Sequence, residues 1–251
     1  MPRIRLLVLA ALVLLAWSPA AHAFRFEPIS RVFEPSGSRA TQSFIIHNTS
    51  SERIAVEVSI GTLERNVDYK ESSRPADEDF LVYPSQVIVG PGSRQTIRVK
   101  WLGDPDPASE RAYRIIAEQL PIELTDPSGR PSPTAQGKLR VLLTYRGSLY
   151  VRPRGAKPVI SVQAATLAKG TNGDKRLSVI LRNRGTAHGL ISSCRGTLRS
   201  RTSGQGIRLR LDPAVSDTKI LAGGQRRYLL PWPKSMAPGP VDARIRCALA
   251  R

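Results

Sequence analysis

The sequence contains few of the residues from which catalytic and metal sites are built. Of its 251 residues, three are histidines and two are cysteines. His22 lies in the N-terminal segment described next, which leaves His47 and His188 in different halves of the chain. Zinc and copper sites usually need three or four ligands, and no common nucleophile, zinc-protease or phosphate-loop motif occurs. The sequence therefore predicts no enzyme, no metal site and no cofactor.

A membrane-spanning run is also lacking. The one apolar run near the N-terminus, Leu6–Trp17, has 12 residues, whereas a transmembrane helix needs about 20. A short basic start precedes it, and small residues follow it up to Ala21 and Ala23, which fit an A-x-A cleavage site. This pattern is typical of a signal peptide. We expect residues 1–23 to be cleaved and the chain to be exported without membrane insertion.

The two cysteines, Cys194 and Cys247, both lie in the C-terminal half of the chain. Neither belongs to a C-x-x-C motif, so the sequence gives little support to a redox or zinc role. An exported protein meets an oxidising environment in which thiols can pair. We therefore expect one disulfide between these two residues.

Negative charge is scarce in the second half of the chain. Residues 1–137 have a net charge of −1, whereas residues 138–251 have a net charge of +19. A basic half can bind nucleic acid or an acidic protein surface. Export argues against nucleic acid, and the basic residues are spread along alternating segments rather than gathered in one run. We expect a solvated basic surface and no nucleic-acid partner.

Helical periodicity is nearly absent after residue 23. Short β-rich runs alternate with turn clusters, and about seven such runs before residue 152 are typical of a β-sandwich. The Pro- and Gly-containing stretch Arg152–Pro158 indicates a linker, and β-rich runs resume after it. The sequence therefore predicts an all-β protein of two β-sandwich domains, residues 24–153 and residues 154–251.

One predicted strand stands out by its length. Lys138–Val151 has 14 residues, whereas strands commonly have about five or six. Leu139, Val141 and Leu143 share one face of it, because strand side chains alternate with a period of two. On pattern alone this is an ordinary core strand that closes the first sandwich.

Four segments in the first domain resemble a known family: Phe26–Phe33, Leu81–Gly92 with Gln95–Trp101, Tyr113–Pro121 and Tyr145–Pro153. They resemble, in the same order along the chain, the periplasmic pilus (fimbrial) chaperones, and especially their archaic, spore-coat-like branch. The second domain is similar only in size and strand character. The resemblance implies two immunoglobulin-like sandwiches joined at an angle, and a role in fimbrium biogenesis and cell wall organization.

The resemblance also implies a function and its partners. The chain would bind and stabilise pilin subunits by donor-strand complementation, an established form of β-strand addition, and would deliver them to an outer-membrane usher. Leu139, Val141 and Leu143 would be the donor residues. An edge strand of this kind also allows self-association when no client is bound.

Two further sites follow from the resemblance. The family holds the client's C-terminal carboxylate with a pair of basic residues, and Arg31 matches the first of them. Ser148 stands where the second, usually lysine, is expected, and Arg146 lies two residues earlier on the same strand face. Arg152 matches the arginine of the domain hinge, for which Glu118 is the predicted partner.

Two other functions are compatible with the composition. A secreted β-sandwich adhesin or carbohydrate-binding module would need an exposed aromatic patch, but Trp101 and Trp232 are scattered among strand and turn segments. A periplasmic enzyme would need a clustered polar pocket, and no motif for one is present.

Overall fold

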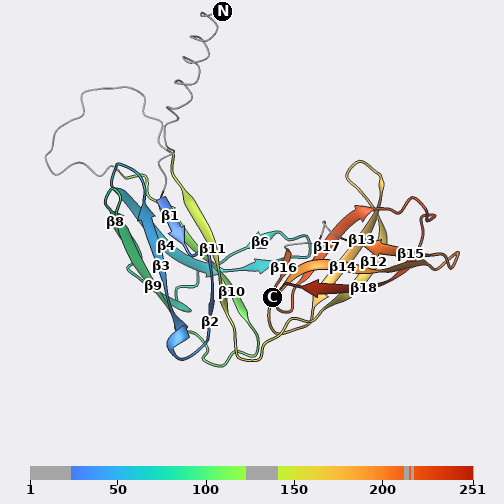
Figure 1. Cartoon of the computed structure of the whole chain (residues 1–251), viewed down its shortest axis with the longest axis horizontal. Coiled ribbons are helices and arrows are strands. Elements are labelled where there is room, and N and C mark those ends of the chain that lie inside the picture. Colours follow the sequence, from blue (N-terminus) through green and yellow to red (C-terminus); the bar gives the residue numbers. More distant parts are fainter. Residues whose placement is uncertain (1–23, 123–140, 212–214, 216–217, 251) are drawn as a thin grey trace, which may run out of the picture.

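The computed structural model describes residues 24–122, 141–211, 215 and 218–250. These residues form two β-sandwiches that follow one another in the chain and stand at an angle (Figure 1). The predicted all-β fold of two sandwiches is therefore confirmed. Within the described segments, no helix is long and apolar enough to cross a membrane. The predicted signal peptide, residues 1–23, lies outside the described residues.

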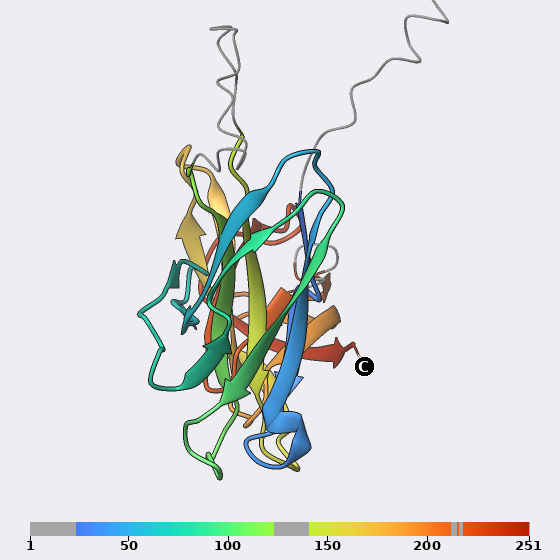
Figure 2. The same ribbon diagram turned by 90° about the vertical axis from the view of Figure 1, so that its left-hand side faces the viewer.

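The first sandwich consists of two sheets and stands in front of the second sandwich in Figure 2. One sheet has the strand order β1-β3-β9-β7 and the other has the order β2-β11-β10-β4-β8. The chain thus passes from one sheet to the other between β1 and β2. The elements are β1 (Phe24–Glu27), β2 (Ser30–Phe33), the 3-10 helix η1 (Ser38–Ala40), β3 (Thr41–Asn48), β4 (Ile54–Thr62), β7 (Phe80–Tyr83), β8 (Gln86–Val89), β9 (Arg94–Trp101), β10 (Arg111–Gln119) and β11 (Thr144–Val151).

Alternation of side chains explains the core of this sandwich. In β9, Ile97, Val99 and Trp101 are buried while the residues between them are exposed. In β11, Leu149 and Val151 are buried in the same core. Inward-facing apolar residues from both sheets meet in this way, and their removal from water is the main stabilising contribution.

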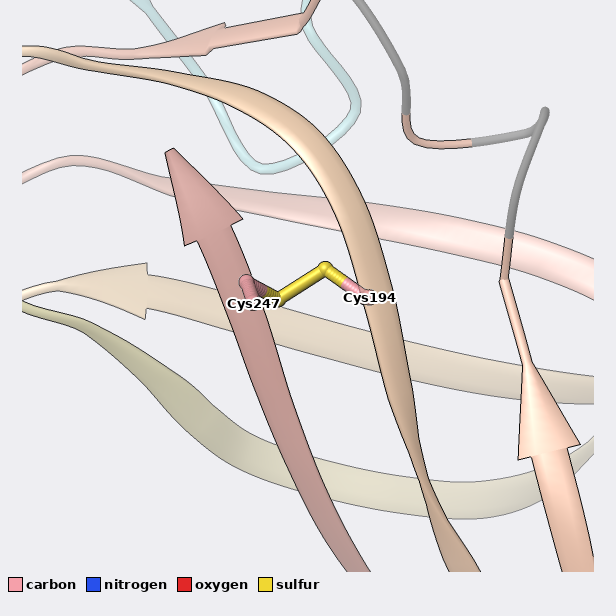
Figure 3. Close-up of a disulfide and its surroundings, with 2 residues drawn as sticks. All are labelled: Cys194 and Cys247. Carbon is pink, nitrogen blue, oxygen red and sulfur yellow. A yellow bond between two sulfur atoms is a disulfide. The ribbon is translucent and has the colours of Figure 1, made fainter. Parts of the chain in front are cut away.

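The second sandwich is built from one sheet of three strands and one of four. β12, β13 and β17 form one sheet, and β14 pairs with β15, β16 and β18 in the other. Cys194 of β14 lies opposite Cys247 of β18, and a disulfide joins them (Figure 3). The pairing is the one expected from the sequence. The strands are β12 (Ile160–Lys169), β13 (Lys175–Asn183), β14 (Gly189–Ser200), β15 (Gly206–Arg210), β16 (Thr218–Ile220), β17 (Gln225–Pro231) and β18 (Val241–Leu249).

The strand period also places the basic residues of the second sandwich. In β15, Arg208 and Arg210 are exposed, and in β18, Arg244 and Arg246 are exposed. The residues between them are partly buried. These arginines therefore lie on solvated faces, where charge costs little.

A small hairpin leaves the first sandwich and reaches the second. Its strands are β5 (Glu64–Arg65) and β6 (Glu71–Ser72), which pair antiparallel. In Figure 1 the hairpin crosses the space between the two sandwiches near β16 and β17. It contributes several of the charged residues described below.

Candidate functional site

The two edges of β11 have different environments. One edge pairs antiparallel with β10 along the whole strand. The other pairs parallel with β2 over Ser148–Val151 alone, preceded by a bond of 2.9 Å from the Ser148 N–H to the Ile29 carbonyl. Among the described residues, the edge from Thr144 to Gly147 has no strand partner. Unpaired backbone groups of this kind can accept a strand from another chain.

The regular strand is shorter than the sequence predicts. Among the described residues β11 begins at Thr144 rather than at Lys138. The last backbone bond to the neighbouring strand runs from the Gln119 N–H to the Leu143 carbonyl, at 3.0 Å. β10 ends at Gln119, and Pro121, two residues later, has no N–H to donate. The segment before Thr144 consequently loses its neighbour.

The predicted donor residues occupy this segment before β11. Leu139 lies outside the described residues. Val141 is 66% exposed, and Leu143 is partly buried against the core of the first sandwich. Tyr145 continues the row inward, with its ring edge-on to Phe24 and its hydroxyl donating to the Phe24 carbonyl at 2.6 Å. An apolar row therefore runs from the core out to an exposed valine.

The structure does not bring Arg31 together with Ser148. Arg31 is the register partner of Leu149, whereas Ser148 is the partner of Ser30. Partners on adjacent strands project from the same face of a sheet, and Leu149 belongs to the core face. Arg31 thus projects from the same face of the sheet as Leu149, although it is exposed because β2 is the edge strand. Ser148 and Arg146 project from the opposite, outer face.

A different arginine lies beside Ser148 on the outer face. Arg114 of β10 is the register partner of Ser148, and its Nη1 donates to the Ser148 Oγ at 2.5 Å. Its Nε and Nη2 donate to both carboxylate oxygens of Glu71, at 2.7 and 2.6 Å. Such a bidentate pair is among the stronger polar contacts in proteins.

Two more arginines complete this group, here called the arginine cluster (Arg65, Arg114 and Arg146). Arg65 Nη2 lies 3.6 Å from Glu71 Oε2, and Arg146 Nη2 lies 3.8 Å from Glu71 Oε1. The hydrogen bond from Arg114 lowers the pKa of Glu71; burial opposes this effect, and the charges of all three arginines add to it. Glu71 is therefore held as a carboxylate among three cations.

The hinge contains a different acid from the predicted one. Arg152 Nε donates to Glu110 Oε2 at 2.5 Å. Glu118 is exposed, and its register partner on β11 is Thr144, at the far end of that strand. The predicted pairing of Arg152 with Glu118 is wrong because antiparallel strands place the end of one beside the start of the other.

The hinge acid also binds the second sandwich. Glu110 Oε1 lies 2.6 Å from His188 Nδ1 and accepts a bond of 3.0 Å from the His188 N–H. The His188 ring packs on the Tyr150 ring, with centroids 4.0 Å apart. Tyr150 is itself fully buried. The Glu110 carboxylate and the pair of His188 and Tyr150 rings are thus two of the contacts that join the sandwiches.

Residues 30–157 match a family model, the PapD N-terminal domain of the pili and flagellar-assembly chaperones. The chain belongs to this family. The match covers half of the chain and includes β11, the arginine cluster and the hinge acid. A sequence comparison with curated proteins gives no match. The resemblance stated from the sequence is confirmed, and membership of the family supports a chaperone role.

Solved structures of pilus chaperones share the fold of this family member. A chain of the CsuC–CsuE chaperone–tip adhesion subunit complex of Acinetobacter baumannii is 15% identical, with a TM-score of 0.59 over 91% of this chain and 93% of that one. The class 5 fimbriae chaperone CfaA is 13% identical, with a TM-score of 0.54 over 88% and 99%. A chain of the SafA pilin–SafB chaperone complex of Salmonella enterica is 13% identical. Its TM-score is 0.51, over 93% of this chain and 96% of that one. The fold is that of non-enzymatic pilus chaperones.

The sequence analysis assigned no role to four residues of the site and the hinge: Arg114, Glu71, Glu110 and His188. Arg114 could have been found from the register of β10 against β11, once Ser148 was singled out. Glu71 and His188 could not, because a hairpin and a domain contact bring them close to residues distant in the sequence. Within the described residues, no group of three or more His, Cys, Asp or Glu could hold a metal ion.

Proposed function

We propose that this chain is a periplasmic chaperone that binds pilus subunits by donor-strand complementation and delivers them to an outer-membrane usher. The free edge of β11 supports this proposal most directly. Among the described residues this edge has no strand partner from Thr144 to Gly147, and it continues into a row of apolar residues that includes Val141 and Leu143. A pilus subunit that lacks one strand could pair with that edge.

The energetics of this strand addition favour the apolar row. In the proposed complex Val141 would leave water and enter the subunit's groove, with Leu139 and Leu143 on the same face. Each aliphatic side chain that is fully buried contributes about 1.5–3 kcal/mol. Part of this is offset by the ordering of side chains at the interface and by the cost of association.

The client's C-terminal carboxylate would bind on the outer face of the sheet beside β11. Arg114 and Ser148 are adjacent there, and Arg146 is 56% exposed at the open side of the group. A guanidinium can hold a carboxylate through two parallel hydrogen bonds. Such a contact would fix the register of the paired strands, since a slip of one residue turns every side chain to the other face.

Export of the chain and its hand-over to an usher are further parts of the proposal. The sequence of residues 1–23 supports export through a cleaved signal peptide, and members of the family are periplasmic chaperones. In the client-free state the same edge of β11 would allow self-association. Release of the client would require exchange of the donated strand for another strand.

The proposal can be tested by co-expression with a pilin encoded beside this chain. Val141→Asp places a charge on the apolar row, and we expect it to reduce recovery of the chaperone–pilin complex by roughly tenfold or more. Leu142→Asp is the matched control, because the neighbouring residue projects from the opposite strand face. Equal recovery for Val141→Asp and the unchanged chain, with both folded, would contradict strand donation.

A further inference from the structure

Glu71 lies at the centre of the arginine cluster although it belongs to a separate hairpin. Arg114 binds both of its carboxylate oxygens, at 2.7 and 2.6 Å, and Arg65 and Arg146 approach it to 3.6 and 3.8 Å. Three cations therefore surround one anion. The group keeps an excess of positive charge, which favours binding of a second or a replacement carboxylate.

The hairpin is held in place by contacts that do not involve Glu71. The Arg227 N–H of β17 donates to the Val67 carbonyl at 2.6 Å, and Arg227 Nη1 donates to Asp68 Oδ1 at 2.9 Å. The ring of Tyr69 lies 3.7 Å from the guanidinium carbon of Arg226. These contacts hold the hairpin against the second sandwich, beside β16 and β17 (Figure 1).

We propose that Glu71 is an internal competitor that occupies the carboxylate site of Arg114, Ser148 and Arg146 until a client's C-terminal carboxylate displaces it. The inference rests on the proposed function and adds the occupant of the client-free site. Glu71 offers the same chemical group as a peptide C-terminus. Its side chain is 25% exposed, so it lies within reach of an incoming carboxylate.

Displacement of Glu71 would require little rearrangement of the chain. The side chain could turn away while Val67, Asp68 and Tyr69 keep the hairpin on β17. Arg146 is more than half exposed and gives the incoming carboxylate a first contact at the open side. Arg114 remains oriented by its bond to the Ser148 hydroxyl, so the site stays formed during the exchange.

An internal competitor changes which ligands bind. The apparent affinity for a carboxylate falls in proportion to the fraction of molecules in which the site is open. A free carboxylate alone would then bind weakly. A client that also pairs with the free edge of β11 would gain enough free energy to open the site, so both contacts would be required for tight binding.

A dipeptide titration tests the competition. The probes are N-acetyl-alanyl-alanine with a free carboxylate and the same dipeptide with a C-terminal amide, added to the exported protein and followed by NMR of arginine side chains. Glu71→Gln keeps the shape of the side chain and removes its charge. We expect it to raise affinity for the free carboxylate roughly five- to tenfold, and to leave the amide unchanged.

Glu64→Gln is the matched control on the same hairpin. Glu64 pairs with Arg74 in an exposed contact at 2.5 Å, outside the arginine cluster. We expect it to bind the dipeptide as the unchanged chain does. Combining Glu71→Gln with Arg114→Gln should abolish the gain, which would locate the gain at Arg114.

Equal or weaker binding of the free carboxylate by Glu71→Gln would overturn the competition, because Glu71 would then only order the arginines. This outcome differs from failure of the proposed function. If Val141→Asp still prevents recovery of pilin, strand donation stands and only the role of Glu71 is rejected. If Val141→Asp has no effect while Glu71→Gln gains affinity, the carboxylate site stands without strand donation.

Discussion

The carboxylate of Glu110, in the first sandwich, binds both Arg152 of its own sandwich and His188 of the second. Its side chain is 1% exposed, whereas those of Arg152 and His188 are 34% and 11% exposed. Loss of this carboxylate would leave Arg152 without its counter-charge at the hinge. We expect a buried acid that links two domains in this way to fix their angle as well as to stabilise them.

We expect Glu110→Ala to lower the free energy of unfolding by about 3–5 kcal/mol, as for other broken buried ion pairs. We also expect it to broaden the range of angles between the sandwiches. Urea unfolding measures the first effect and small-angle X-ray scattering the second. Glu118→Ala is the control, since Glu118 is an exposed acid of the same sandwich. Equal stability of the two variants would contradict a hinge role for Glu110.

The same acid predicts a pH dependence of stability. Burial tends to raise the pKa of Glu110, but the hydrogen bond and charge of His188 and the hydrogen bond of Arg152 together lower it below its ordinary value of 4.5. A carboxyl whose pKa is lower in the folded state stabilises the fold above its unfolded value and loses that contribution as pH falls through its folded value. The contribution should therefore be complete above pH 4.5 and decline below it.

Urea unfolding of the unchanged chain and Glu110→Gln between pH 3 and pH 6 measures this contribution. We expect a constant difference in unfolding free energy above pH 4.5 and a shrinking difference at lower pH. A difference that grows on acidification would have the wrong sign. Because the pKa of Glu71 is lowered too, the comparison with Glu110→Gln is needed to isolate the hinge.

Arg114 should matter more for client binding than Arg31. Arg114 lies against Ser148 on the outer face, whereas Arg31 shares the opposite face with Leu149. We expect Arg114→Gln to weaken the pilin complex by roughly tenfold or more, and Arg31→Gln to have a smaller effect. Competition binding with purified pilin complexes measures both. A larger loss from Arg31→Gln would place the carboxylate at the other face of the sheet.

Arg98→Gln serves as a control for loss of positive charge at a distance from the site. Arg98 is an exposed residue of β9, in the other sheet of the first sandwich. A general electrostatic attraction between chaperone and pilin would weaken with all three substitutions and would be screened by salt. A specific carboxylate site predicts that Arg98→Gln leaves the affinity unchanged.

The disulfide between Cys194 and Cys247 should stabilise the second sandwich. It joins residues 53 apart in the sequence, and closing a loop of that size contributes about 2–4 kcal/mol. We expect Cys194→Ala combined with Cys247→Ala to lower the melting temperature, and reductant to do the same to the unchanged chain. Thiol labelling of the native exported protein should find no free thiol; two free thiols would disprove the bond.

Several features follow from the sequence without any tertiary information. The short apolar run and its cleavage site indicate export, and alternating β-rich runs around a Pro- and Gly-containing linker indicate two sandwiches. Burial in β9 and exposure of arginines in β15 follow the period of two. Such patterns are local, because a strand's alternation depends only on residues near one another in the chain.

The site depended on tertiary structure, because its members are far apart in the sequence. The register of β10 against β11 places Arg114 beside Ser148, and the hairpin of β5 and β6 brings Glu71 to Arg114. Antiparallel pairing puts Arg152 near Glu110 rather than Glu118. Strand composition predicts that residues form strands, but their partners are fixed only when whole sheets pack and every inward side chain must be buried at once.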